Sequence, residues 1–131
     1  MKIPPGFHTI APYFIVQDAP AFIAFLEQGL GGKEVQRTCD DAGTIRNAMV
    51  RLGDSTVMLS EASEAWPAMP ASYYLYVEDA HAAMTRATSA GATAIMAVAD
   101  MPYGDRQGGV RDAFGNLWWL SQRLEDGPYS A

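Results

Sequence analysis

The sequence has very few residues that could form a disulfide or a cysteine-based metal cluster. Its 131 residues include one cysteine, Cys39, and two histidines. A single cysteine cannot form an intramolecular disulfide, and it excludes metal sites that need several thiolates. We therefore expect Cys39 to be an ordinary small strand residue, as in a protein of the reducing cytosol.

Positive charge is also scarce. Nine Lys and Arg residues stand against fifteen Asp and Glu residues, which gives a formal net charge of −6, and the basic residues form no cluster along the chain. A surface that follows the phosphates of a nucleic acid needs such a cluster, so nucleic acid is excluded as an expected partner. A cationic or neutral small molecule is easier to accommodate.

Long hydrophobic runs are absent. Every apolar run ends well before the roughly 20 residues that a helix needs to cross a bilayer. The first residues, MKIPPGFHTI, lack the apolar core of a signal peptide. We therefore expect a soluble, cytoplasmic protein without a membrane partner, and the length predicts one domain over residues 1–131.

A hexapeptide pattern occurs twice. The stretch VQDAPA at 16–21 returns as VEDAHA at 77–82, and each copy follows an aromatic run typical of a β-strand. Apolar residues at helical spacing follow both copies. Asp18 and Asp79 stand where a side chain can cap the first turn of a helix. Both halves of the chain are therefore predicted to begin with a strand and then a helix.

Three further β-like runs follow each predicted helix. These runs are 33–39, 44–52 and 56–60 in the first half, and 94–99, 105–111 and 117–122 in the second. The sequence thus predicts an α+β protein made of two βαβββ modules, at about 8–63 and 72–123, which arose by duplication.

Four strands with a helix on one face leave the other face open, and two such sheets together can surround a cavity. Concave, largely apolar cavities with a few polar groups are the usual sites for small molecules. Strand alternation predicts which side chains share a face. The candidates are Ala11, Tyr13 and Ile15 in the first module, and Ser72, Tyr74 and Tyr76 in the second.

Three stretches carry a resemblance to a known family. They are IPPGFHTIAPYFIVQDA, VRLGDSTVMLSEA and PYGDRQGGVRDAFGNLWWLSQR. Together they resemble the vicinal oxygen chelate superfamily, the glyoxalase, bleomycin-resistance and dioxygenase group, and most closely its PhnB-like branch. The resemblance implies two βαβββ modules that form a curled, eight-stranded open barrel around a cavity. It also implies a homodimer.

The superfamily is named for a divalent metal held by four side chains, usually His and Glu. Carried over to this chain, three of these positions fall on Ala11, Ser72 and Trp119. Only Glu61, at the end of a predicted strand, offers a ligand that such metals bind well. One carboxylate cannot hold a divalent ion against water, so we expect no metal and no other cofactor.

An aromatic side chain at a ligand position favours a stacking surface. Alternation predicts that Trp119 faces the cavity and that Trp118 faces a helix. The predicted ligand pocket consists of Tyr13, Tyr74, Tyr76, Trp119, Glu61 and Arg106. Two alternatives stay open: the aromatic residues could simply fill the core, and Arg106 could form a salt bridge with Asp105 or Asp112 instead of contacting a ligand.

These observations favour a small-molecule binding protein that works without a metal and sequesters a cationic or aromatic compound. The alternative is an enzyme that depends on Glu61. Such an enzyme would be a lyase or dioxygenase with a displaced metal site, or a metal-free isomerase with Glu61 as the base. A third alternative is an accessory role without any ligand.

Overall fold

The computed structural model describes residues 1–129. The chain divides into two compact units, Met1–Pro70 and Ala71–Ala131. Within the described residues, neither helix has the length and apolar character needed to cross a bilayer.

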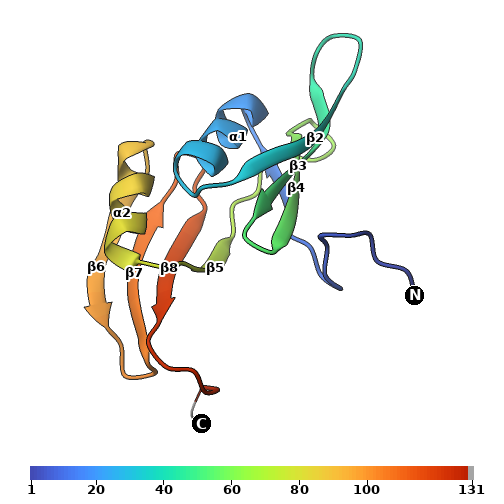
Figure 1. The fold of residues 1–131 in the computed structure, drawn as a ribbon. Helices are drawn as coiled ribbons and strands as arrows, with labels where there is room; N and C mark the ends of the chain where they lie inside the picture. The colour runs from blue at the N-terminus through green and yellow to red at the C-terminus, as the bar shows by residue number, and fades with distance from the viewer. Residues whose placement is uncertain (130–131) are drawn as a thin grey trace. The chain divides into compact units, whose positions relative to one another are not determined.

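The first unit contains a four-stranded mixed sheet and one helix. In chain order its elements are β1 (Tyr13–Val16), α1 (Ala19–Gln28), β2 (Lys33–Cys39), β3 (Ile45–Leu52) and β4 (Ser55–Glu61). The strand order is β1-β4-β3-β2, with β1 parallel to β4 and the other pairs antiparallel. Figure 1 shows the elements of this unit in blue to green.

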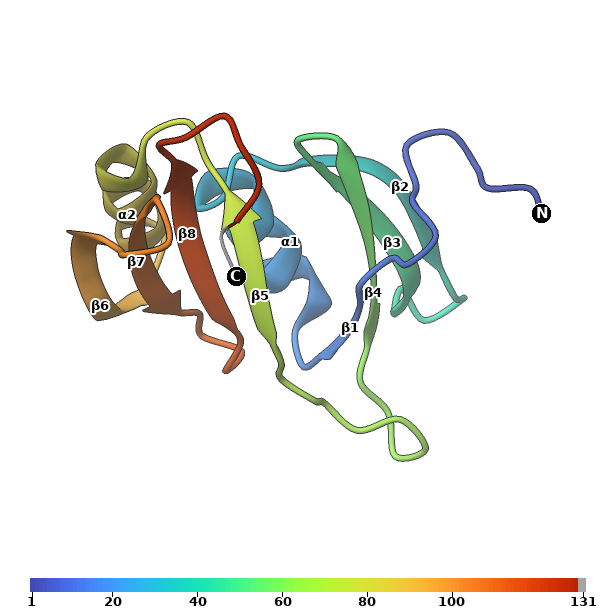
Figure 2. The ribbon, with the colours of Figure 1, turned by 90° about the horizontal axis from the view of Figure 1, so that it is seen from below.

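The second unit repeats this order. Its elements are β5 (Ser72–Tyr76), α2 (Ala80–Ser89), β6 (Thr93–Asp100), β7 (Asp105–Arg111) and β8 (Leu117–Arg123). The strand order is β5-β8-β7-β6, and β5 is parallel to β8 (Figure 2). The predicted α+β class and the two βαβββ modules are therefore confirmed, with two open sheets that do not close on themselves.

The two modules share caps and strand register. The Asp18 carboxylate accepts a hydrogen bond from the N–H of Ala21 at 3.2 Å, and Asp79 accepts one from Ala82 at 3.1 Å. Tyr13 pairs with Met58 in the first sheet. Tyr74 pairs with Trp119 in the second, and both members lie 61 positions further along the chain. This equivalence identifies corresponding residues in the two halves.

Each helix covers one face of its own sheet. Phe22 of α1 is fully buried, and its ring centroid lies 4.9 Å from that of Phe14 on β1. The second helix is poorer in large apolar residues and buries Ala80 and Ala87 instead. It contacts β6, β7 and β8, so the candidate site must be sought on the opposite face of the second sheet.

A buried aspartate organises the turn between β7 and β8. Oδ1 of Asp112 accepts hydrogen bonds from the N–H groups of Phe114 and Asn116, both at 2.9 Å. Gly115 takes a φ of 87°, a conformation that glycine adopts without strain. The Asn116 side chain then accepts the N–H of Ala71 at 3.1 Å, which fixes the start of β5. The turn therefore sets the register of the strands beside it.

Candidate functional site

Trp118 and Trp119 lie on opposite faces of the second sheet, as strand alternation predicts. Trp118 is 2% exposed, and its indole N–H donates to Oδ2 of Asp112 at 2.8 Å. Its ring stacks on Tyr73 with a centroid distance of 5.0 Å. Leu120 shares this face and is fully buried. Trp118 is therefore a core residue on the side of the sheet that α2 covers.

Trp119 lies on the face away from α2. Its indole N–H donates to the hydroxyl of Ser72 at 2.8 Å. The ring lies close against the backbone of β7, because a Cβ placed on Gly109 would stand only 2.8 Å from ring atom Cζ3. Glycine at this position is what lets the indole approach the strand. The ring position is thus fixed by one hydrogen bond and one glycine.

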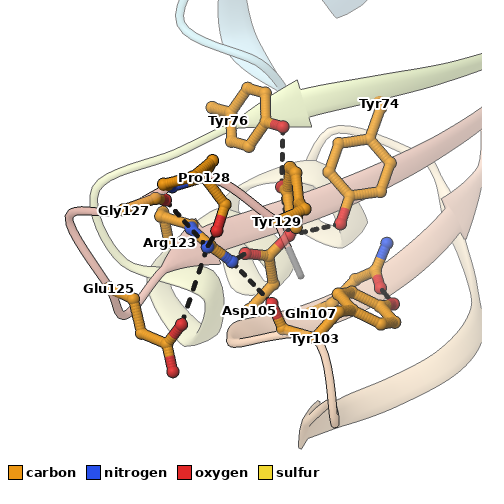
Figure 3. Close-up of polar contacts among 10 residues, drawn as sticks. All are labelled: Tyr74, Tyr76, Tyr103, Asp105, Gln107, Arg123, Glu125, Gly127, Pro128 and Tyr129. Carbon is orange, nitrogen blue, oxygen red and sulfur yellow. Dashed lines mark hydrogen bonds and ion pairs between the residues drawn. The ribbon is translucent and has the colours of Figure 1, made fainter. Parts of the chain in front are cut away.

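Four tyrosines of the second unit surround a depression in its surface. It has a volume of about 370 Å³ and is lined by Tyr74, Tyr76, Tyr103 and Tyr129. The first two residues come from β5, the third from the β6–β7 loop, and the last from the segment after β8 (Figure 3). Edge-to-face contacts join Tyr74 to Tyr76, at 5.4 Å, and Tyr103 to Tyr129, at 6.4 Å. All four rings are partly exposed and can contact a ligand.

Asp105 lies beneath the rings and connects them. The residue is 0% exposed. Its Oδ2 accepts hydrogen bonds from the hydroxyls of Tyr74, at 2.5 Å, and Tyr129, at 2.7 Å, while Oδ1 accepts Arg123 Nη1 at 3.0 Å (Figure 3). A buried carboxylate is stable only with partners of this kind.

Arg123 links this carboxylate to the end of the described chain. Beyond Asp105, its guanidinium donates to the carbonyls of Tyr103, Gly127 and Pro128 at 2.6, 3.0 and 3.3 Å. It also lies 4.2 Å from the centroid of the Tyr129 ring. A guanidinium over an aromatic face is a favourable cation–π arrangement. One side chain therefore holds both the loop before β7 and the segment after β8.

The hydrogen bonds of this cluster shift its ionisation. Burial alone would raise the pKa of Asp105, but hydrogen bonds from Tyr74, Tyr129 and Arg123 outweigh it and lower that pKa below its ordinary value. Burial and the bond to Asp105 raise the pKa of Tyr74 to about 12. The pKa of Tyr129 is raised by its bonds to Tyr76 and Asp105 and by burial. At neutral pH the cluster holds a carboxylate anion and neutral phenols.

Two more polar side chains lie on this face. The Tyr103 hydroxyl donates to the side-chain carbonyl of Gln107, a buried residue of β7. Ser121 of β8 is completely buried. Among residues 1–129, no atom makes a hydrogen bond of normal geometry to its hydroxyl, although the Tyr74 phenol is near it. The face thus contains a buried polar atom of the kind that bound water or a ligand usually satisfies.

Three of the predicted pocket residues occur together in the second unit. Tyr74 and Tyr76 line the depression, and Trp119 is the direct strand neighbour of Tyr74. Tyr13 belongs to the first unit, where it is 47% exposed.

Glu61 caps helix α1. Its two carboxylate oxygens accept the N–H groups of Asp18 and Ala19, both at 2.8 Å. In the second module, Gln122 accepts the N–H of Ala80 at 3.0 Å in the same way. Glu61 and Gln122 are 61 positions apart and are therefore corresponding residues. A helix N-terminus favours an acidic side chain, which gives Glu61 a structural role.

Arg106 forms its salt bridge with a residue that the sequence did not suggest. Its Nε lies 2.7 Å from Oδ1 of Asp100, the residue opposite it in the β6–β7 pair. The prediction that Arg106 pairs with Asp105 or Asp112 is therefore wrong. Asp105 directly precedes Arg106 on β7, so the two side chains point to opposite faces of the sheet.

Sequence reasoning missed Tyr103, Asp105, Arg123 and Tyr129 as site residues. Asp105 began the predicted strand 105–111, and Arg123 lay just beyond the predicted strand 117–122. Neither had a visible partner in the sequence, and they meet because they are paired in the β7–β8 register. Tyr129 lies beyond the last strand, where alternation gives no orientation. The sequence neighbours of Asp105 are Gly104, Arg106 and Gln107, so no apolar pattern indicated that this carboxylate is buried.

A family model describes this architecture. The model for the Glyoxalase/Bleomycin resistance protein/Dioxygenase superfamily matches residues 6–120. The chain belongs to this superfamily. The resemblance predicted from the sequence is therefore confirmed.

Relatives with names or structures share nearly the full length of the chain. Uncharacterized protein Mb0911c of Mycobacterium bovis is 30% identical over 129 residues, which cover 90% of this chain and 85% of the relative. TioX from Micromonospora sp. ML1 has a similar structure, with a TM-score of 0.75, 27% identity, and coverage of 89% of this chain and 99% of its own.

The fold is shared with two further proteins of lower identity. TnmS3, an antibiotic binding protein from Streptomyces sp. CB03234, is 21% identical with a TM-score of 0.68, and the match covers 88% of this chain and 97% of TnmS3. A PhnB protein from Bacillus cereus is 16% identical with a TM-score of 0.66, and the match covers 88% and 99% of the two chains.

The residues at the family's metal positions do not fit a divalent ion. Ala11 and Ser72 correspond across the repeat, and Trp119 corresponds to Met58 and not to Glu61. Alanine, tryptophan and a methionine thioether are not ligands for hard or borderline divalent metals. The Ser72 hydroxyl already accepts a hydrogen bond from the Trp119 indole N–H. Both carboxylate oxygens of Glu61 are likewise engaged, because they accept the N–H groups at the start of α1. Within residues 1–129, no three His, Cys, Asp or Glu side chains are grouped to hold a metal.

Proposed function

We propose that the protein binds a small aromatic molecule, neutral or cationic, on the open face of the second sheet, and that it does so without a metal at the family positions. The observation that carries the proposal is the depression of about 370 Å³ lined by four tyrosines above the buried Asp105 carboxylate. Its volume falls at the small end of the range for ligand pockets.

Ring contacts would supply most of the affinity. Four phenol rings and the nearby Trp119 indole present flat surfaces that can stack on a planar ligand. The affinity does not require a catalytic group, because sequestration needs only that the bound state is favourable.

Charge restricts which aromatic molecules fit. The Asp105 carboxylate is ionised, and the chain has a formal net charge of −6. An anionic ligand would be repelled, whereas a neutral hydrogen-bond donor or a cation would be attracted. Ser121 lies on the same face of β8 as Trp119, and its buried hydroxyl has no hydrogen-bond partner among residues 1–129.

The fold is compatible with this role, since the antibiotic binding protein TnmS3 is built on it. At 21% identity that likeness concerns the fold alone, so the proposal depends on the tyrosines and Asp105 of this chain.

The proposal is tested by a thermal-shift screen of planar aromatic compounds, divided into cationic, neutral and anionic sets. Cationic or neutral compounds should raise the melting temperature, because a ligand that binds only the folded state stabilises it. Binding of any hit is then measured by calorimetry in Tyr74→Ala and Tyr103→Ala, which should lose it. His81→Ala, an exposed residue of α2 on the covered side of the sheet, is the matched control and should bind like the wild type. Equal binding by all variants would refute the site.

A further inference from the structure

Tyr129 occupies a position that suits a free phenol. Its hydroxyl lies 2.7 Å from Oδ2 of Asp105 and 2.7 Å from the hydroxyl of Tyr76. The Tyr103 ring contacts the Tyr129 ring edge to face, and the Arg123 guanidinium lies over the Tyr129 ring (Figure 3). The phenol is thus held by a carboxylate, a hydroxyl, a ring and a cation, which are contacts that a ligand could also use.

The backbone that carries Tyr129 is attached mainly through Arg123. The N–H of Leu124 donates to the carbonyl of Gly104 at 2.9 Å, and the carbonyls of Gly127 and Pro128 accept from Arg123. Residues 124–129 belong to neither a helix nor a strand, and the Tyr129 side chain is 46% exposed. A short irregular segment outside the sheet and the helix opens at lower cost than either of them.

We propose that Tyr129 is an internal competitor for the ligand: its phenol occupies a phenol-binding site on Asp105, and a ligand that carries a phenolic hydroxyl displaces it. This inference rests on the proposed function, because it specifies the ligand class and the regulation of the same site. Displacement exchanges one neutral O–H donor to Oδ2 for another, so the buried carboxylate keeps its hydrogen bonds throughout.

The chemistry of Asp105 selects the ligand class. The carboxylate accepts hydrogen bonds but donates none while it is ionised, so the ligand must bring the donor. An aryl ether of the same shape would leave the carboxylate short of one partner. Sites built to hydrogen-bond a hydroxyl discriminate strongly against analogues that lack it.

The tether makes Tyr129 an effective competitor. A group on a short flexible linker reaches its site at an effective concentration of about millimolar. A free phenol can bind only to those molecules in which Tyr129 has left the site. Its apparent association constant is therefore lowered in proportion to the fraction of such molecules. Removing the Tyr129 side chain removes this competition and should increase the apparent affinity for phenols.

The experiment uses calorimetry to measure binding of p-cresol, the side chain of tyrosine as a free molecule, to the 131-residue protein. Tyr129→Ala should bind p-cresol at least about fivefold more tightly than the wild type. Tyr129→Phe, which removes only the hydroxyl, should give an intermediate affinity. 4-Methylanisole, which has the same ring but no donor, should bind Tyr129→Ala at least about tenfold more weakly than p-cresol does.

Three results would overturn the inference. These are equal or weaker p-cresol binding to Tyr129→Ala than to the wild type, wild-type behaviour of Tyr129→Phe, and no p-cresol binding to Tyr129→Ala up to about 20 mM, well above the effective concentration of the tether. Tyr129 is half-exposed and lies outside the strands, so its replacement leaves the core intact. Failure of the proposed function is seen separately, as unchanged binding of planar ligands in Tyr74→Ala and Tyr103→Ala.

Discussion

The phenol oxygen of Tyr74 lies 2.5 Å from Oδ2 of Asp105, although β8 separates their strands β5 and β7. The tyrosine side chain therefore reaches across a whole strand to a carboxylate that is fully buried. Hydrogen bonds to Asp105 join β5, β7, β8 and the segment after β8. They also shift the pKa values of Asp105 and Tyr74, and these shifts can be measured.

Asp105→Asn should destabilise the protein. The substitution keeps the size of the side chain but removes the charge that Arg123 and two phenols stabilise. We expect the free energy of unfolding to fall by about 2–4 kcal/mol, as for the loss of one partner of a buried charged pair. Urea denaturation measures the change. Asp100→Asn, which breaks an exposed pair with Arg106, is the control and should have little effect.

The stability from Asp105 should depend on pH. Its pKa is lowered in the folded state, so its contribution is present above the unfolded pKa of about 3.9 and is lost as pH falls through the lower folded value. Between pH 5 and pH 3, the wild type should therefore lose more stability than Asp105→Asn. Parallel curves for the two proteins would show that the carboxylate carries no such contribution.

Three tyrosines of the second unit should ionise at raised pH. The pKa of Tyr74 is raised to about 12, and burial raises that of Tyr73, while hydrogen bonds raise that of Tyr129. The phenol form of Tyr74 thus stabilises the fold below the unfolded pKa of about 10, and this stability is lost as pH rises toward 12. Absorbance at about 295 nm, a wavelength sensitive to tyrosinate, should show a phase near pH 12 that shrinks in Tyr74→Phe. An unchanged phase in this variant would contradict the prediction.

Trp119→Ala should weaken binding of a planar ligand by roughly 1–3 kcal/mol, the size of base stacking on aromatic side chains. The indole is held by Ser72 and by the close approach to Gly109, so it is preorganised for stacking. Calorimetry with a hit from the screen measures the loss. Trp66→Ala removes an exposed tryptophan of the first unit and should leave the affinity unchanged.

Zinc, nickel and manganese ions should leave the melting temperature unchanged, because the residues at the family's metal positions lack suitable donors. Glu61→Gln should lower the free energy of unfolding by about 0.5–1 kcal/mol through the weaker cap on α1. A rise of several degrees with any of these ions, abolished in Glu61→Gln, would contradict the metal-free proposal and favour an enzyme.

We expect a homodimer, as the resemblance implies. Each sheet has two outer strands with one strand neighbour each, and such edges are usually covered in stable proteins. Sedimentation at micromolar concentration should give about twice the chain mass of 14.2 kDa. A single species at the mass of one chain would contradict this prediction.

The sequence by itself determined the elements and their order. Local signals suffice for this: Asp18 and Asp79 cap helices, glycines mark turns, and alternation places Trp118 and Trp119 on opposite faces. The repeat at 61 positions also carried the strand register, because a duplicated module folds the same way twice.

Only the tertiary structure decided what surrounds each polar group. Glu61 stood at a strand end in the sequence, but the position of α1 makes it a cap. Asp105 gains its partners from β5, β8 and the segment after β8, and these meet only through strand pairing and the path of that irregular segment. The physical reason is that periodicity fixes the face on which a side chain lies, whereas its hydrogen-bond partners depend on residues far away in the chain.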